Sequence, residues 1–196
     1  MFKPTKIYFA SDFHFGAMGV LSNAEREKLV IRWLDEVSKD ATEIYLVGDI
    51  FDFWFEYKYV VPKGCVRLLG KLAQLVDSGI ELHIFTGNHD MWMFGYLKNE
   101  LGVILHKKPH LKTIHNKVFL LGHGDGLGPG DKGYKFIKRL FSSKINQWLF
   151  ARIHPNTGIW LMKKFSQKSR ESEKEVISFL GEEKERLIRY AEQKVK

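Results

Sequence analysis

Four short polar clusters contain the residue types that bind metal ions and catalyse hydrolysis, and each cluster follows an apolar run. They are Asp12-Phe13-His14, Gly48-Asp49-Ile50-Phe51-Asp52, Gly87-Asn88-His89-Asp90 and Gly122-His123-Gly124-Asp125. One such cluster alone is ordinary turn chemistry, because Gly, Asn and Asp favour turns. Four clusters rich in carboxylates and imidazoles, all at the ends of apolar runs, instead predict one shared site.

The donor atoms in these clusters favour catalytic metal ions. Carboxylate, imidazole and amide oxygen without thiolate suit Mn²⁺, Fe or Zn²⁺ at expanded coordination and do not suit a structural zinc. We expect two divalent ions about 3.5 to 4 Å apart, with manganese as the first choice and iron or zinc as alternatives. Asp49 would bridge the two ions. Asp12 and His14 would hold the first ion, and Asn88 and His123 would hold the second. Such a pair clamps phosphoryl oxygens and lowers the pKa of a water for in-line attack.

Strand-like runs alternate with amphipathic helices in the first half of the chain. The expected strands are 6–11, 43–47 and 80–85, the expected helices are 24–40 and 64–78, and a short helix follows near 93–100. Asn23 predicts the N-cap of the first helix, whose buried stripe would be Leu29, Val30, Trp33, Leu34 and Val37. This order is typical of an α/β sheet built from crossover units, in which ligands bind beyond the carboxyl ends of the strands.

The second half changes from strands to helices. Further strands are expected at 103–106, 110–114 and 118–121, and His115-Asn116 predicts a tight hairpin between the last two. From residue 131 the pattern is helical as far as residue 194. We therefore divide the chain into an α/β core, 1–126, and a basic helical part, 127–196. The histidines His83, His106, His110 and His115 are interpreted as structural.

The positive charge is concentrated in the helical part. Residues 1–100 hold 11 basic and 14 acidic side chains, whereas residues 101–196 hold 20 basic and 9 acidic ones. From Lys132 to Arg170 there are ten Lys or Arg and no Asp or Glu, and aromatic residues lie between them. This pattern predicts an anionic partner, which is a nucleic acid, a phosphorylated ligand or an anionic membrane surface.

Composition also restricts the location of the protein. No apolar run approaches the roughly 18 residues of a membrane-spanning helix, and the N-terminus has no signal-peptide pattern. The only cysteine, Cys65, has no partner for a disulfide within the chain. We expect a single globular cytoplasmic protein, peripheral on the inner membrane where it meets a membrane, with no obligate protein partner.

The order and spacing of the four clusters over residues 6–125 resemble the calcineurin-like metallophosphoesterase superfamily. The resemblance implies a β-sandwich flanked by helices, a dinuclear metal centre and phosphoester hydrolysis. It also implies that His89 acts on the leaving group and that Asp52 orients His89. Asp125 would hydrogen-bond His123 from outside the metal ligands, and the alternative is that Asp125 caps the segment that follows.

The superfamily takes its last metal ligands from a later Gly-His-x-His motif, and this sequence has no such motif. Five of the seven expected ligands are present. The strands that would complete the second sheet are also missing. We expect the natural chain to continue beyond Lys196 and to supply both features, and the alternative is a degenerate relative that only binds.

A narrower resemblance covers more of the chain. Three further segments are similar to the UDP-2,3-diacylglucosamine diphosphatase family. They are Asp52-Phe53-Trp54-Phe55, Asp131-Lys132-Gly133-Tyr134 and, in a basic helical cap, Ser166-Gln167-Lys168-Ser169. That family cleaves its substrate to UMP and lipid X in lipid A biosynthesis. The resemblance implies a phosphorylated, lipid-linked nucleotide substrate that contacts Asn88, His89, Asp131, Tyr134, Ser166 and Arg170.

Two other functions fit parts of the pattern. One is a phosphodiesterase or nuclease of the same superfamily, in which the basic helical part would bind a nucleic-acid backbone. The other is a scaffold that uses the fold for protein contacts without catalysis. The apolar side chains between the cations favour a lipid-linked substrate over a nucleic acid, and the intact polar clusters argue against a scaffold.

Overall fold

The computed structural model describes residues 6–128, 130, 132–174 and 186–195. The chain forms two compact units, residues 1–108 and residues 109–196. The boundary expected near residue 126 lies inside the second of these units and stays a prediction. The helix expected over residues 175–185 lies outside the described residues.

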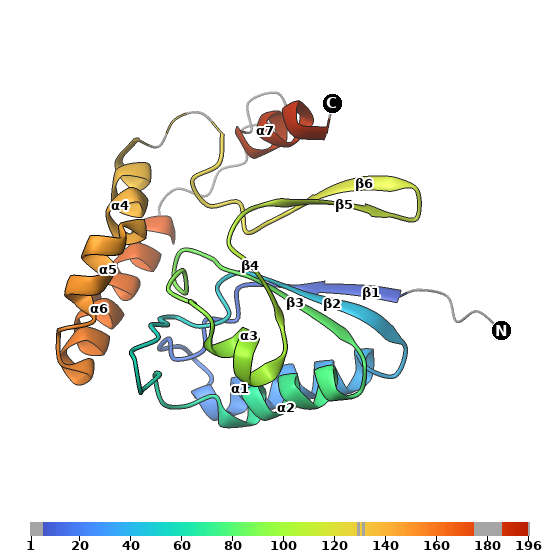
Figure 1. The fold of residues 1–196 in the computed structure, drawn as a ribbon, viewed down its shortest axis with the longest axis horizontal. Coiled ribbons are helices and arrows are strands. Elements are labelled where there is room, and N and C mark those ends of the chain that lie inside the picture. The colour runs from blue at the N-terminus through green and yellow to red at the C-terminus, as the bar shows by residue number, and fades with distance from the viewer. Residues whose placement is uncertain (1–5, 129, 131, 175–185, 196) are drawn as a thin grey trace. The chain divides into compact units, whose positions relative to one another are not determined.

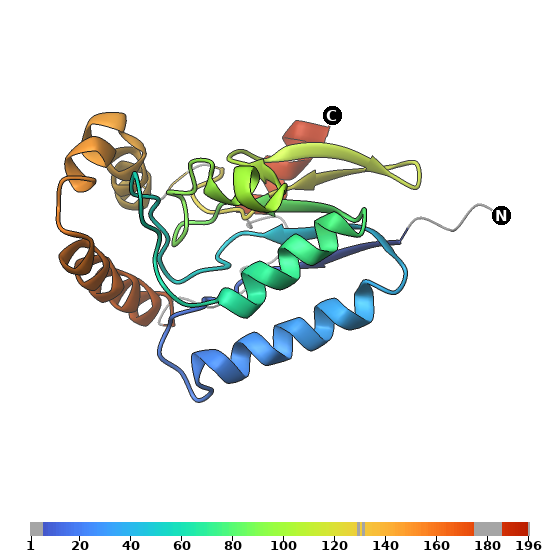
Figure 2. The ribbon, with the colours of Figure 1, turned by 60° about the horizontal axis from the view of Figure 1, so that its bottom comes forward.

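The first unit is a parallel sheet with helical crossovers. Its strands β1 (Lys6–Ala10), β2 (Ala41–Val47), β3 (Glu81–Phe85) and β4 (Ile104–His106) pair in the order β1-β2-β3-β4. The connecting helices are α1 (Asn23–Val37), α2 (Val66–Asp77) and α3 (Tyr96–Leu101). Figures 1 and 2 show α1 and α2 along the same face of the sheet. The predicted α/β class is therefore confirmed.

Successive side chains along each strand point to opposite faces of the sheet, and the two faces differ in composition. Ile44 and Leu46 of β2 are fully buried in one hydrophobic core with leucines of α1 and α2. Tyr45 and His83 alternate with these core residues and so project from the opposite face. There the rings of Tyr45 and His83 stack at a centroid distance of 4.3 Å, across paired positions of β2 and β3. The core face holds the unit together, and the opposite face carries polar and aromatic side chains.

The N-cap of α1 is Ser22, and the prediction of Asn23 is wrong. The Ser22 hydroxyl accepts from the Glu25 N–H, and the Glu25 carboxylate accepts from the Ser22 N–H at 2.8 Å. This reciprocal arrangement is a capping box, which satisfies two backbone donors at once. The Asn23 side chain instead accepts from the Gly16 N–H at 2.7 Å and so holds the loop that follows β1.

The buried stripe of α1 is also narrower than predicted. Leu34 and Val37 are buried, whereas Leu29 is 43% exposed, so its predicted burial is wrong. The buried side chain on this part of the helix is Glu27, whose carboxylate accepts from the Leu68 N–H at 2.9 Å at the start of α2. A carboxylate that satisfies the first turn of the neighbouring helix tolerates burial because it is hydrogen-bonded there.

The second unit begins with a hairpin and continues as helices. Strands β5 (His110–Ile114) and β6 (Lys117–Leu121) are antiparallel. His115 and Asn116 have φ values of 48° and 63°, as a two-residue type I′ turn requires, so the predicted hairpin is confirmed. The helices are α4 (Lys132–Ser142), α5 (Lys144–Phe150), α6 (Pro155–Lys174) and α7 (Arg186–Val195), and α7 contacts β6.

The hairpin and the parallel sheet belong to different units, so the β-sandwich implied by the resemblance stays a prediction. Among the described residues, no helix combines the length and the apolar composition needed to cross a membrane.

Candidate metal centre

Main-chain hydrogen bonds continue beyond the ends of β1 and β2 and bring two of the polar clusters together. The Asp12 N–H donates to the Gly48 carbonyl at 3.1 Å, and the His14 N–H donates to the Asp49 carbonyl at 3.0 Å. These bonds place the Asp-x-His cluster beside the Gly-Asp-x-x-Asp cluster at the carboxyl edge of the sheet, where α/β folds bind ligands.

Three of the predicted metal ligands have left-handed backbone conformations. The φ values are 59° at Asp12, 46° at His14 and 52° at Asp49. Such values are uncommon for residues other than glycine, although Asp, Asn and His are enriched among the exceptions. Strained backbone of this kind clusters at functional sites, where the surrounding structure holds it in place.

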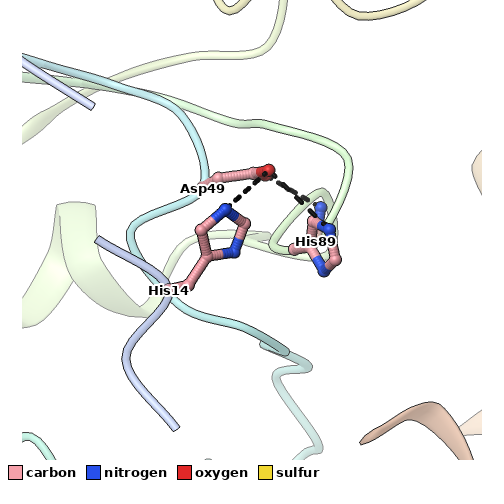
Figure 3. A group of neighbouring side chains, drawn as sticks. All are labelled: His14, Asp49 and His89. Atoms are coloured by element: carbon pink, nitrogen blue, oxygen red, sulfur yellow. Dashed lines mark hydrogen bonds and ion pairs between the residues drawn. The ribbon is translucent and has the colours of Figure 1, made fainter. Parts of the chain in front are cut away.

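The side chains of His14, Asp49 and His89 form the centre of the site (Figure 3). The distance from Asp49 Oδ2 to Nε2 is 3.7 Å for His14 and 3.9 Å for His89. One ligand atom from each residue lies within 4.8 Å of the others. His14 is half-buried, and the other two residues are buried. Loops that follow β1, β2 and β3 thus supply one donor each.

Asp52 lies behind both imidazole rings. Its main-chain carbonyl is 3.2 Å from His89 Nδ1, and because a carbonyl only accepts, this hydrogen bond places a proton on Nδ1. Its carboxylate is 3.7 Å from His89 Nδ1 and 3.8 Å from His14 Nδ1. These contacts turn His89 Nε2 toward Asp49, so Asp52 is placed to orient the ring.

Asp90 is fully buried, and its sequence pattern predicted no role for it. Its carboxylate accepts from the N–H groups of Ile50 at 2.8 Å, Phe51 at 3.2 Å and Gly87 at 2.7 Å. Burial, and then the negative charge of Asp49, raise the pKa of Asp90 from 3.8 to about 7. Asp90 thus joins the loops after β2 and β3. Its place directly after Gly-Asn-His was the only sequence signal for this role.

Gly87 permits the close approach of the same two loops. A Cβ atom at Gly87 would lie 2.1 Å from Asp49 Oδ1 and 2.6 Å from the Asp49 nitrogen. The His89 N–H can therefore donate to Asp49 Oδ1 at 2.9 Å. A side chain at position 87 would displace the carboxylate at the centre of the site.

The other predicted ligands differ in how the structure places them. Asp12 Oδ1 is 3.9 Å from His14 Nε2, and the Asp12 side chain is 55% exposed. Asn88 is half-buried in the loop between Gly87 and His89. His123 follows β6 in the second unit. Asp12 therefore lies beside His14 of the central group. Asn88 and His123 remain predicted ligands.

In the second unit, Asp125 contacts α4. The Tyr134 hydroxyl donates to the Asp125 carboxylate at 2.6 Å, and the Lys138 ammonium donates to the Asp125 carbonyl at 2.9 Å and pairs with its carboxylate. The role of Asp125 beside His123 stays a prediction. Ser166 is buried in α6. Asp131 and the side chain of Arg170 lie outside the described part of the chain.

These residues fit divalent metal ions. Imidazole nitrogens and carboxylate oxygens lie within 4.8 Å of one another, and no thiolate is among them. This donor set is typical of manganese, iron and zinc centres with open positions. His89 is part of this group, whereas the family resemblance predicted a role for it at the leaving group and in substrate binding and no role as a metal ligand.

Comparison with known proteins shows which proteins this chain is similar to. No protein-family model matches it. It is 41% identical over 169 residues to a Porphyromonas gingivalis protein, covering 86% of this chain and 64% of that protein. It is 30% identical over 123 residues to an Edwardsiella ictaluri protein, covering 63% of this chain and 47% of that one. These matches show that the chain is homologous to proteins of the metallophosphoesterase superfamily, and the α/β fold agrees with that similarity.

Within that superfamily the relatives have one name. Both proteins are named UDP-2,3-diacylglucosamine hydrolase, and the chain is homologous to them. The chain spans less than two thirds of the length of each of these two relatives. A solved structure of an Aquifex aeolicus protein of unknown function aligns with a TM-score of 0.40 and 16% identity, covering 69% of this chain and 71% of that one.

Proposed function

We propose that this protein hydrolyses the diphosphate bond of UDP-2,3-diacylglucosamine to give UMP and lipid X in lipid A biosynthesis. The observation that carries the proposal is the convergence of His14, Asp49 and His89 at the ends of three parallel strands. The 41% identity to a relative named UDP-2,3-diacylglucosamine hydrolase supports this substrate. Water adds across the P–O–P bond, so each product leaves with one phosphate.

The site residues have separate roles in this proposal. Asp49 would be shared by two divalent ions, preferably manganese; Asp12 and His14 would hold the first ion, and Asn88 and His123 would hold the second. Bound ions neutralise phosphoryl oxygens and activate water for attack.

In this proposal His89 acts on the departing phosphate as an imidazolium: Nε2 donates its proton to the leaving oxygen, and Nδ1 keeps its own proton. The main-chain carbonyl of Asp52, 3.2 Å from Nδ1, holds the His89 ring in place.

The outer surface of α4, α5 and α6 is suited to a lipid-linked substrate. Its exposed aromatic and aliphatic side chains, each between 54 and 71% exposed, are Phe136, Ile145, Trp148, Trp160 and Phe165. Cations accompany them, since the Arg152 guanidinium lies 4.4 Å from the Trp148 ring centroid and the Lys164 ammonium lies 4.2 Å from the Trp160 centroid. Combined basic and apolar surface is typical of helices that lie on anionic membranes.

We therefore propose that α4 to α6 contact the acyl chains and the anionic surface of the inner membrane from the cytoplasmic side. Contacts with the phosphorylated part of the substrate are assigned to Asn88, His89, Asp131, Tyr134, Ser166 and Arg170, as the family resemblance implies. The exposed apolar side chains favour this function over a nuclease.

The test of catalysis is UMP release from UDP-2,3-diacylglucosamine by the whole natural protein with Mn²⁺. We expect the Asp49→Asn and His89→Ala variants to lose activity by about 100-fold or more, and Glu100→Gln, on the exposed surface of α3, to keep it. Hydrolysis of a generic phosphodiester without UMP release would show that the substrate is wrong. Failure to hydrolyse either compound with Mn²⁺ present would show that the reaction class is wrong.

The test of membrane contact is cosedimentation with vesicles of phosphatidylglycerol and phosphatidylethanolamine. Phe136→Ser with Trp148→Ser should weaken binding, because both side chains are exposed on α4 and α5. Tyr59→Ser removes a still more exposed aromatic ring from the first unit and should leave binding unchanged. Equal binding by both variants would contradict the assignment to α4 to α6.

A further inference from the structure

A second group of metal-binding side chains lies near the starts of β2 and β3. His83 Nε2 is 3.7 Å from a Glu43 carboxylate oxygen and 3.6 Å from a Glu81 carboxylate oxygen. One ligand atom from each of the three residues lies within 4.8 Å of the others. Glu43 precedes Asp49 by six residues, about 20 Å along an extended chain. The group is therefore separate from the candidate metal centre.

Strand register places the two carboxylates directly opposite each other. Glu43 and Glu81 are paired positions of the parallel strands β2 and β3. Their side chains thus project from the same face, because paired residues share a face of the sheet. Like charges directly opposite each other destabilise a sheet. A bound cation would convert this repulsion into ligation.

Neighbouring side chains orient the three donors. The Tyr45 hydroxyl donates to Glu43 at 2.6 Å, and the Tyr45 ring lies parallel to the His83 ring, with 5° between their planes. His83 Nδ1 is 3.0 Å from His106 Nε2, so the two nitrogens share a proton. When Nδ1 donates that proton, His83 Nε2 presents its lone pair to both carboxylates. Outer partners of this kind fix metal-binding histidines.

We propose that Glu43, Glu81 and His83 bind one divalent transition-metal ion, with Zn²⁺ as the probe. Imidazole nitrogen and carboxylate oxygen both bind such ions, and three protein ligands leave a fourth position for water. His83 is 7% exposed, whereas the Glu81 side chain is 62% exposed and gives the ion a path from solvent. The ion would join the starts of β2 and β3. This inference does not depend on the proposed hydrolysis.

The first test counts Zn²⁺ by titration calorimetry of the whole protein. An Asp49→Asn background weakens the candidate metal centre, so the proposed site contributes a larger share of the binding. We expect the Asp49→Asn variant to bind one more Zn²⁺ per chain than the double variant that carries both Asp49→Asn and Glu81→Gln. Glu100→Gln in the same background removes another exposed carboxylate and should leave the count unchanged.

The second test measures the midpoint of thermal unfolding in the same three proteins. Zn²⁺ at about 100 times its dissociation constant favours the folded state by about 100-fold, which raises the midpoint by several degrees. This rise should disappear with Glu81→Gln and persist with Glu100→Gln. If adding Glu81→Gln changed neither the number of bound Zn²⁺ ions nor the rise in the unfolding midpoint, the proposed site would be wrong. Equal losses with both substitutions would indicate nonspecific surface binding and would also overturn it.

Discussion

The buried carboxyl of Asp90 makes stability depend on pH in a way that Asp90→Asn should remove. Three backbone N–H groups donate to this carboxylate. Burial, and secondarily the charge of Asp49, nevertheless raise its pKa from 3.8 to about 7. The folded protein therefore keeps a proton that the unfolded chain releases near pH 4. Asparagine resembles the protonated acid in size and is neutral throughout this range.

The sign and the size of the effect follow from this difference in pKa. Because the folded-state value is the higher one, the stability from Asp90 is fully present below about pH 4 and is lost as the pH rises through about 7. Within that window each pH unit changes the free energy of unfolding by about 1.4 kcal/mol. The wild-type protein should lose about 2 kcal/mol relative to Asp90→Asn between about pH 5 and pH 7, and nearly 3 kcal/mol by about pH 8.

The assay is urea unfolding of both proteins from about pH 5 to pH 8, with a chelator present because bound cations would offset the charge of Asp49. The wild-type minus variant difference in unfolding free energy should fall by about 3 kcal/mol and then level off above about pH 7. Asp77→Asn, at the exposed end of α2, controls for the change in net charge. A difference that stays constant or grows with pH would refute the argument from burial.

Three further substitutions test the supports of the fold and the site. Gly87→Ala should lower UMP release at least 10-fold, because its Cβ would lie 2.1 Å from Asp49 Oδ1; activity within twofold of wild type would contradict the close approach. Glu56→Ala should lower the unfolding free energy by about 3 kcal/mol in urea, because its carboxylate accepts from three N–H groups of residues 94–96. Ser22→Ala should cost about 1 kcal/mol in the same assay through loss of the N-cap, and an unchanged midpoint would show that the capping box does not stabilise α1.

Hydrophobic runs and turn chemistry were sufficient to predict most elements. Strands such as β2 and β3 contain apolar residues that periodicity detects, and the clusters directly after β1 and β2 lie at the carboxyl edge of a parallel sheet, where His14 and Asp49 are 3.7 Å apart. The turn at His115 and Asn116 was predictable because few residue pairs tolerate left-handed conformations at both positions.

Tertiary contacts decided the features that the sequence did not reveal. Ser22 and Asn23 are both residue types that favour the N-cap. The Gly16 N–H donates to the Asn23 side chain, and Ser22 is the residue that caps the helix. The role of Asp90 depends on backbone donors about 40 residues away in the chain. The pairing of Glu43 with Glu81 depends on strand register, which periodicity alone does not determine.

The left-handed residues at the candidate metal centre connect the fold to its proposed chemistry. Asp12, His14 and Asp49 each adopt positive φ, at a cost of roughly 1 kcal/mol or more per residue. The hydrogen bonds between the loops after β1 and β2, together with the carboxylate of Asp90, offset that cost. The folded protein itself therefore fixes the backbone of these three predicted ligands. An ion bound by them would require little reordering of these loops, so the energy of ligation would be available for affinity.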